Sequence, residues 1–334
     1  MEQQSLYQKY KKIVELYNNQ PNLAHRTSSS IKLQQYSTPA PLAFMMGAYC
    51  GIYKDGLYFE SSAGNGLLTI AGKPENFIVN EIDEIRRRNL QSQGFKEVWS
   101  KDASKPFGCN YKEYLKNKYE RSFYAKIGKG NRLGQRMRIK PDLMAVGYEV
   151  FAEKGTKALA YFRKFNFIEL LEEGNYILED NCPTYNKYFD AILTNPPFGS
   201  LDETVMYDSS PINSLEQLMS LRALDTMKDD GKAAIIIGGH NEYDNAGRIK
   251  SSRSFFVYLF SRYEILDLIN ISGRELYSRQ GTSFNTRIIL VGNRKNNIGG
   301  FPPIIEREMS ENEIYSPTPV TDFETLYNRI SKFI

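Results

Sequence analysis

The run Phe189-Asp-Ala-Ile-Leu-Thr-Asn-Pro-Pro-Phe198 decides how the rest of the chain is interpreted. Its apolar first part predicts a buried strand, and the proline pair that closes it is typical of a parallel strand covered on both faces. Asn195 then stands at the carboxyl end of the strand, where open α/β sheets hold their ligands. Because Pro196 and Pro197 have fixed φ angles and no N–H, we expect the carbonyls of Asn195 and Pro196 to face outward beside the ring of Phe198. Such a tip suits a planar amino group, for example the exocyclic NH2 of a nucleobase.

A glycine-rich turn follows the strand predicted over residues 57–60. It reads Ser61-Ser-Ala-Gly-Asn-Gly66, and a helix is expected to begin at residues 67–70. Strand, Gly-x-Gly and helix open a nucleotide-binding βαβ unit, and glycines let the backbone approach a ligand closely. Glu60 at the strand tip disfavours a phosphate and suits a cation, such as an ammonium or sulfonium group. By itself this turn is a weak signal, because many Gly-rich turns bind nothing.

Acidic residues end the next two predicted strands, residues 77–83 and 97–101. Glu81 lies 21 residues after Glu60, about the spacing at which such folds place an acid on ribose hydroxyls. Asp102 follows the second of these strands and is placed to accept a hydrogen bond from an adenine amino group. Singly, each acid is explained as a solvated cap. Three acids at successive strand ends, before Asn-Pro-Pro-Phe at a fourth, point to one binding site.

The ordered motifs resemble those of gamma-type amino-group DNA methyltransferases, which methylate adenine N6 with S-adenosylmethionine. The matching segments are residues 34–39, 60–66, 81–82, 102, 195–198 and 281–291, in the order of the family. The resemblance covers roughly residues 30–105 and 186–293. It implies a Rossmann-like methyltransferase fold that acts on double-stranded DNA in bacterial, phage or mobile-element restriction–modification settings.

The resemblance also implies the site residues. Those implied as catalytic are Asn195, Pro196, Pro197 and Phe198. S-adenosylmethionine is the implied cofactor, and the residues implied to bind it are Thr38, Pro39, Glu60, Ser62, Ala63, Gly64, Gly66, Glu81, Ile82, Asp102, Ala103 and Asn195. Hydrogen bonds from adenine N6 to Asn195 and to the Pro196 carbonyl would favour attack on the methyl group, while Phe198 stacks on the flipped base. The late motif, residues 281–291, is expected to help wall the target-base pocket.

Length and composition set further bounds. At 334 residues the chain can bury one large core and a smaller appendage. No signal peptide or membrane span is visible. Cys50, Cys109 and Cys182 form no metal or disulfide pattern, which favours a reducing cytoplasm. His25 and His240 are the two histidines of the sequence, so we predict no metal centre and no histidine base.

One stretch is strongly basic. Residues 111–140 carry ten cationic side chains against Glu113 and Glu120, a local balance of +8 in a chain of +4. The cations are Lys112, Lys116, Lys118, Arg121, Lys126, Lys129, Arg132, Arg136, Arg138 and Lys140. Tyrosines and phenylalanines lie among them, which suits a phosphate backbone with bases or sugars beside it. An ordinary solvated face explains the stretch equally well.

The predicted fold is α/β, a doubly wound and mostly parallel sheet with a terminal antiparallel hairpin and a basic insertion. The expected segments are residues 1–105 (N-terminal helices and cofactor half), 106–187 (insertion), 188–293 (catalytic half) and 294–334 (tail). Further strands are expected at 233–238, 265–271 and 283–293, and helices at 41–52, 84–93, 152–165, 215–227, 252–263 and 323–334. Gamma-type enzymes usually carry a target-recognition region after the late motif, and little chain remains here. Recognition is therefore expected in the insertion, in a separate specificity subunit or in a larger polypeptide.

Two other readings stay open. A methyltransferase of RNA bases or of protein glutamine would use the same Asn-Pro-Pro-aromatic tip on a different amino or amide group. A catalytically idle DNA-binding or antirestriction module would keep the fold but lose its motifs. Because the glycine turn and the tetrapeptide are both intact, the sequence favours an enzyme.

Overall fold

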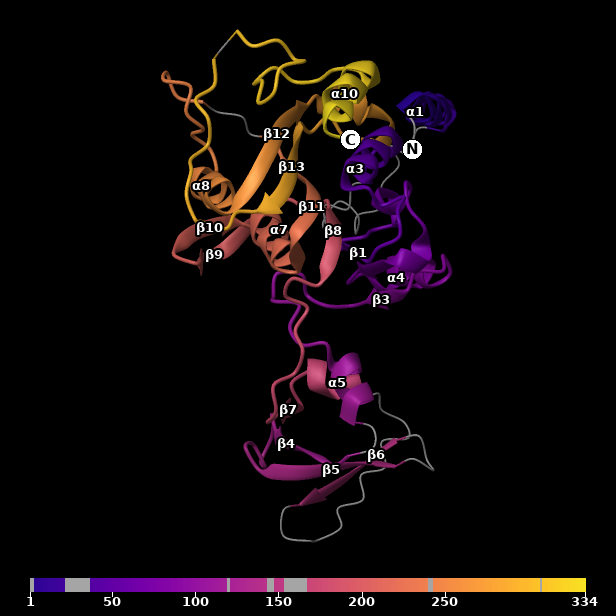
Figure 1. The fold of residues 1–334 in the computed structure, drawn as a ribbon, viewed down its shortest axis with the longest axis vertical. Helices are drawn as coiled ribbons and strands as arrows, with labels where there is room; N and C mark the ends of the chain where they lie inside the picture. Colours follow the sequence, from indigo (N-terminus) through magenta and orange to yellow (C-terminus); the bar gives the residue numbers. More distant parts are fainter. Residues whose placement is uncertain are drawn as a thin grey trace. The chain divides into compact units, whose positions relative to one another are not determined.

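The chain divides into two compact units in the computed structural model, Met1–Phe107 with Asn186–Ile334, and Gly108–Tyr185 (Figure 1). The structure describes residues 3–21, 37–118, 121–142, 147–152, 167–239, 243–306 and 308–334. Gln34, Gln35 and Tyr36 of the segment before the glycine turn lie outside these ranges, as do His25 and His240.

The larger unit is built on a seven-stranded sheet in the order β12-β13-β11-β8-β1-β2-β3. Its strands are β1 (Tyr58–Glu60), β2 (Phe77–Asn80), β3 (Glu97–Trp99), β8 (Phe189–Thr194), β11 (Met227–Gly238), β12 (Tyr263–Ile271) and β13 (Thr286–Arg294). The neighbours from β3 to β11 pair in parallel, and β13 runs antiparallel to both β11 and β12. All seven strands predicted for the sheet are present, so the predicted fold class is confirmed.

Strand order reverses between β1 and β8, which fixes where a ligand can bind. From β1 the chain moves outward through β2 and β3, and it then returns to β8 on the other side of β1. Glu60 lies beside Leu193 in the register, so the carboxyl ends of β1 and β8 meet at one edge. Connections leave in opposite directions at such a switch point and open a crevice there.

Helices bury both faces of this sheet. They are α1 (Gln3–Asn19), α3 (Ala40–Cys50), α4 (Glu84–Gln91), α7 (Leu215–Asp225), α8 (Arg253–Arg262), α9 (Gly273–Leu276) and α10 (Phe323–Ile330). Side chains of α1, α3 and α10 form one core with Ala191 and Leu193 of β8. Ile192, between them, is fully buried and points to the opposite face, where α7 contacts β8 and β11. The sheet is therefore doubly wound.

Some local structure differs from expectation. The predicted helix start after the glycine turn is a short 3-10 helix, η1 (Leu67–Thr69), and β2 ends at Asn80 rather than at residue 83. The other 3-10 helices within the described residues are η2 (Pro74–Asn76), η4 (Ser278–Gln280) and η5 (Ser331–Phe333). An unpredicted antiparallel hairpin, β9 (Ser200–Tyr207) with β10 (Ser210–Ser214), follows the Asn-Pro-Pro-Phe segment.

The smaller unit is an antiparallel sheet, which sequence reasoning missed. Its order is β6-β5-β4-β7, from β4 (Phe123–Ile127), β5 (Arg136–Asp142), β6 (Gly147–Ala152) and β7 (Tyr176–Leu178), with helices α5 (Tyr111–Lys118) and α6 (Phe167–Glu172). Phe123, Ala125, Met137 and Ile139 are buried under both helices. The helix predicted over residues 152–165 lies outside the described residues, apart from Ala152, which ends β6.

Candidate functional site

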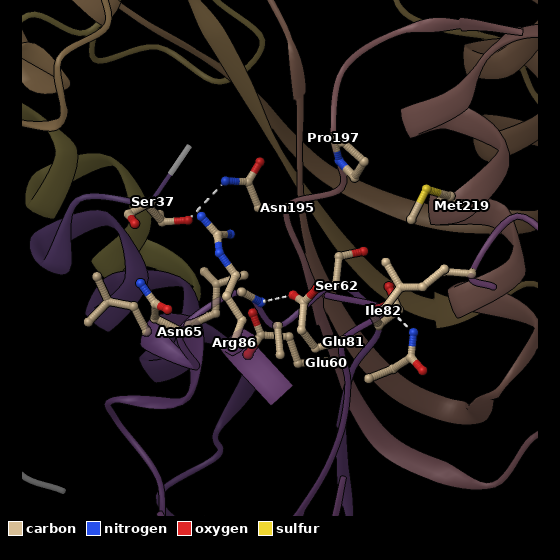
Figure 2. A pocket seen from close by; sticks show the side chains of 18 of the residues that line it. Ser37, Glu60, Ser62, Asn65, Glu81, Ile82, Arg86, Asn195, Pro197 and Met219 are labelled. Carbon is tan, nitrogen blue, oxygen red and sulfur yellow. Dashed lines mark hydrogen bonds between the residues drawn. The ribbon is translucent and has the colours of Figure 1, made fainter. Parts of the chain in front are cut away.

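A cavity of about 490 Å³ opens at the carboxyl edge of β1, β2, β3 and β8 (Figure 2). The residues that line it are Gln20, Ser37, Thr38, Glu60, Ser61, Ser62, Ala63, Gly64, Asn65, Leu67, Leu68, Asn80, Glu81, Ile82, Arg86, Lys101, Asp102, Ala103, Ser104, Asn195, Pro197, Leu215, Met219 and Gln280. In Figure 2, Asn195 and Pro197 lie toward the top of the view and Glu60 and Glu81 toward the bottom. The wall therefore joins the glycine turn, the strand-end acids and the Asn-Pro-Pro segment.

The structure brings most of the sequence-predicted residues into this one cavity. Those that line it are Thr38, Glu60, Ser62, Ala63, Gly64, Glu81, Ile82, Asp102, Ala103, Asn195 and Pro197. Pro39, Gly66, Pro196 and Phe198 do not line it. Their roles, like those of the lining residues, stay predictions.

A row of polar side chains ties the strand ends together below the cavity. Asn80 donates through Nδ2 to the carbonyls of Ser61 and Lys101, both at 3.0 Å, and its Oδ1 accepts from the Lys101 N–H at 2.7 Å. The hydroxyls of Ser61 and Thr194 are hydrogen-bonded at 2.7 Å. These bonds satisfy backbone groups that the parallel ladder leaves open where the strands diverge, and they fix the edge on which the site stands.

The glycine turn is held in left-handed backbone conformations. Gly64 has φ +56° and Gly66 φ +80°, values that a residue with a Cβ adopts at a cost. A Cβ on Gly66 would lie 3.0 Å from Leu90 and 3.1 Å from Phe95, so this glycine packs against the helix side of the turn. That packing explains why Gly66 shapes the turn without lining the cavity, whereas Gly64 faces it.

Glu81 clamps the turn from the neighbouring strand end. One carboxylate oxygen accepts from the Gly64 N–H at 2.7 Å, and the other accepts from the Asp83 N–H at 2.8 Å. Burial raises the pKa of Glu81, and these two backbone N–H groups and the charge of Arg86 oppose that shift. Each carboxylate oxygen retains a lone pair for another donor, so the clamp leaves capacity for a ligand hydroxyl.

Unsatisfied polar atoms gather in the cavity. Oε2 of Glu60, Oγ of Ser62 and Nε2 of Gln20 are buried and have no hydrogen-bond partner within the described residues. Burial raises the pKa of Glu60 well above its ordinary value, and the charge of Glu81 raises it further. Leaving a buried polar group unpaired costs free energy, so these three atoms give the cavity wall polar groups that a polar ligand would satisfy.

Asn195 is oriented from outside the tetrapeptide. Its Nδ2 donates to Oγ1 of Thr38 at 3.0 Å, which sets the amide so that Oδ1 remains as an acceptor. At the end of the tetrapeptide, the ring of Phe198 lies 6.0 Å from the ring of Phe284, at 31°. Phe284 belongs to the late motif, residues 281–291, and is 44% exposed. Asn195 thus presents an oriented acceptor to the cavity, and the tetrapeptide that contains it also supplies one ring of this aromatic pair.

Asp102 and Ile82 border the cavity differently. Oδ1 of Asp102 accepts from the N–H and hydroxyl of Ser104 at 2.9 and 2.6 Å, while the residue itself is exposed. Ile82 is 67% exposed although it is apolar. An exposed isoleucine at a cavity rim offers a flat contact for a ring, and the Asp102 carboxylate, at the end of the neighbouring strand β3, is placed to accept from a ring amino group.

Several lining residues escaped sequence reasoning. Leu215 and Met219 come from α7 and Gln20 follows α1, so spacing along the chain does not connect them with the motifs. Gln280 directly precedes the late motif, residues 281–291. Asn80 was detectable, because it is the polar end of an otherwise apolar strand, Phe-Ile-Val-Asn.

Comparison with known proteins returns solved structures that align over most of this chain at low sequence identity. No family model and no curated protein matches the chain. A proposed RNA methyltransferase from Pyrococcus horikoshii aligns at 14% identity and TM-score 0.42, over 86% of this chain and 98% of that one. A proposed class I S-adenosylmethionine-dependent methyltransferase from Listeria monocytogenes aligns at 8% identity and TM-score 0.43, over 98% of this chain and 77% of that one. A chain of a type I restriction–modification system aligns at 12% identity and TM-score 0.46, over 97% of this chain and 54% of that one. This chain therefore spans about half the length of that structure.

Two classes of feature are not found in the part of the chain that the structure describes. No helix there combines the length and apolar character needed to cross a membrane. No group of three histidine, cysteine or acidic side chains there could hold a metal ion.

Proposed function

We propose that this protein is an S-adenosylmethionine-dependent methyltransferase that modifies N6 of a flipped-out adenine in double-stranded DNA. The observation that carries the proposal is the single cavity in which the glycine turn and strand-end acids meet Asn195. One half of that wall suits a cofactor with a nucleoside and a cationic group. The other half suits a planar amino group, and the two reactants would meet between them.

The residues present fit the cofactor. Glu60 offers a buried carboxylate to an ammonium group, while Gln20 and Ser62 offer unsatisfied donors that suit a carboxylate, which together match an α-amino acid end. Glu81 suits ribose hydroxyls, and the exposed side chain of Ile82 suits the adenine ring. When bound, S-adenosylmethionine supplies an electrophilic methyl group on a sulfonium.

The chain's own groups prepare the acceptor. Oδ1 of Asn195 and the Pro196 carbonyl accept the two N6–H hydrogens of adenine, which withdraws the N6 lone pair from the ring and stabilises the positive charge that develops there. Phe198, paired with Phe284, stacks on the base that has left the duplex. Since the methylated nitrogen is strongly acidic, its proton passes to solvent and no strong base is required.

The first prediction is that Asn195→Ala abolishes methyl transfer while cofactor binding persists. The variant loses an acceptor aimed at the target amino group, so we expect a fall in turnover of at least about 100-fold, the scale of one lost transition-state hydrogen bond. Transfer of labelled methyl to adenine-containing duplex DNA measures activity, and calorimetry measures cofactor affinity. Near-normal turnover in this variant contradicts the mechanism.

The same assay separates the alternatives. Duplex DNA, single-stranded RNA and a glutamine-containing peptide are offered to the unaltered chain, and the products are identified by mass spectrometry. N6-methyladenine in DNA supports the proposal. Methylated RNA or methylglutamine with unmodified DNA would assign the site to the other amino and amide substrates.

A further inference from the structure

The outward face of the smaller unit's sheet concentrates positive charge. In the β4–β5 register, Tyr124 stands opposite Arg138 and Lys126 opposite Arg136. The residues between them, including Ala125 and Met137, are buried on the other face under α5 and α6. The alternation of cationic and apolar residues over positions 136–140 of β5 therefore places these cations on one face. We call Tyr124, Lys126, Arg136 and Arg138 the basic face.

This arrangement is unfavourable without a counter-charge. Like charges directly opposite each other on a sheet destabilise it, and Lys126 faces Arg136 in that way. Glu179 pairs with Arg136 at 2.8 Å and neutralises one cation. Within the described residues no carboxylate pairs with Lys126 or Arg138, and both are exposed. A polyanion lying across the strands would supply the missing charge.

The surroundings of Tyr124, the aromatic residue on the basic face, favour a duplex over a single-stranded nucleic acid. The guanidinium of Arg136 lies 3.8 Å from the centre of the Tyr124 ring, so one face of that ring is already covered. Single strands are held largely by bases that stack on open aromatic rings, whereas duplexes are held through phosphates. We propose that the basic face binds the phosphate backbone of duplex DNA; this inference rests on the proposed function and names the surface that holds its substrate.

The experiment removes two cations from the basic face and two from elsewhere in the same unit. Lys126→Ala/Arg138→Ala is compared with Lys112→Ala/Lys116→Ala, whose lysines are exposed on α5, the helix that covers the opposite side of the sheet. Arg136 is kept because it holds Glu179 and Tyr124. Both variants lose the same charge, so a general electrostatic effect would change them equally.

Binding of a labelled duplex to the full chain is measured by anisotropy across a salt series, without cofactor. We expect the basic-face variant to lose affinity about tenfold and its log–log salt slope to fall by about 1.8, from two phosphate contacts at about 0.9 each. The α5 variant should retain most of both. Equal affinity and slope in the two variants would overturn the inference, and so would a loss confined to single-stranded RNA.

Failure of the inference about the basic face is distinguishable from failure of the proposed function. The same salt series is run on Asn195→Ala, which lacks the catalytic amide but has an intact basic face. If the unaltered chain makes no N6-methyladenine while the duplex binds through the basic face, the catalytic assignment fails and the surface stands. If the unaltered chain makes N6-methyladenine but the basic-face variant binds the duplex as tightly as the unaltered chain, the catalytic assignment stands and the surface assignment fails.

Discussion

Glu60 is the residue at which stability and binding conflict. Its carboxyl is fully buried and one oxygen has no partner, so burial, followed by the charge of Glu81, raises its pKa. A carboxyl whose folded pKa exceeds its unfolded value binds more protons in the folded state, so stability present at low pH is lost as pH rises through the folded pKa. A cationic ligand favours the carboxylate, so its binding should release a proton.

The second prediction follows from the raised pKa of Glu60 and the proton that ligand binding should release. Cofactor affinity should rise with pH through a window above the ordinary carboxyl range, and calorimetry in buffers of different ionisation enthalpy should register proton release. Glu60→Gln should weaken binding and remove most of that release, leaving the contribution of Glu81, whose pKa is also raised. Without ligand, the same variant should unfold at equal or higher denaturant at neutral pH. Proton uptake on binding to the unaltered chain contradicts the assignment.

Elements of the larger unit were predictable where one local pattern dominated. Residues 189–194 are apolar, stop at two prolines and form β8; Asp83 caps α4 by accepting from the Arg86 N–H at 3.0 Å, as its type and position indicate. The smaller unit was missed because the ten cations were interpreted only as a charged stretch, although Arg136-Met-Arg-Ile-Lys140 in β5 has the period of two of a half-buried strand. The β9–β10 hairpin was missed because most of its residues are exposed and carry little hydrophobic signal.

Contacts between segments far apart in the sequence limit how much of the site can be predicted from the sequence. Spacing along the chain placed Glu60, Glu81 and Asn195 at strand ends, and strand order then brought them to one cavity. The partner of Asn195, Thr38, was expected on the cofactor side, and its hydrogen bond to the amide could not be foreseen from spacing.

The third prediction separates two demands on the glycine turn. Gly66 and Gly94 both have φ +80°, but a Cβ on Gly94 meets nothing within 4 Å, whereas one on Gly66 would contact Leu90 and Phe95. Gly94→Ala should therefore cost about 1–2 kcal/mol of unfolding free energy from left-handed strain. Gly66→Ala should cost about 1–3 kcal/mol more because of overpacking.

The lone tryptophan of the sequence, Trp99, lies in β3 and reports on the larger unit. Denaturant unfolding followed by its fluorescence gives both free energies directly. Equal losses in the two variants would mean that the turn tolerates the added methyl group and that packing against α4 does not constrain it.

At the scale of the whole molecule, the C-terminal segment is part of the larger unit. Arg329 of α10 donates to both oxygens of Asp267 in β12, at 2.7 and 2.8 Å, and both side chains have no exposed area. Val320 pairs with Ile271 at the carboxyl end of the same strand. A fully buried, bidentate pair of this kind holds two segments 62 residues apart in one arrangement.

The last prediction is that breaking this pair destabilises the unit that holds the candidate site. Arg329→Met leaves the Asp267 carboxylate buried without its cation and should cost about 3–5 kcal/mol, whereas the double variant Arg329→Met/Asp267→Leu should recover much of the loss, because a well-packed apolar pair is often as stable as a buried ion pair. Trp99 fluorescence measures both. If the single variant unfolds at the same denaturant concentration as the unaltered chain, the C-terminal helix does not support the sheet. If the double variant is no better than the single one, packing around Arg329, and not its charge, holds α10 in place.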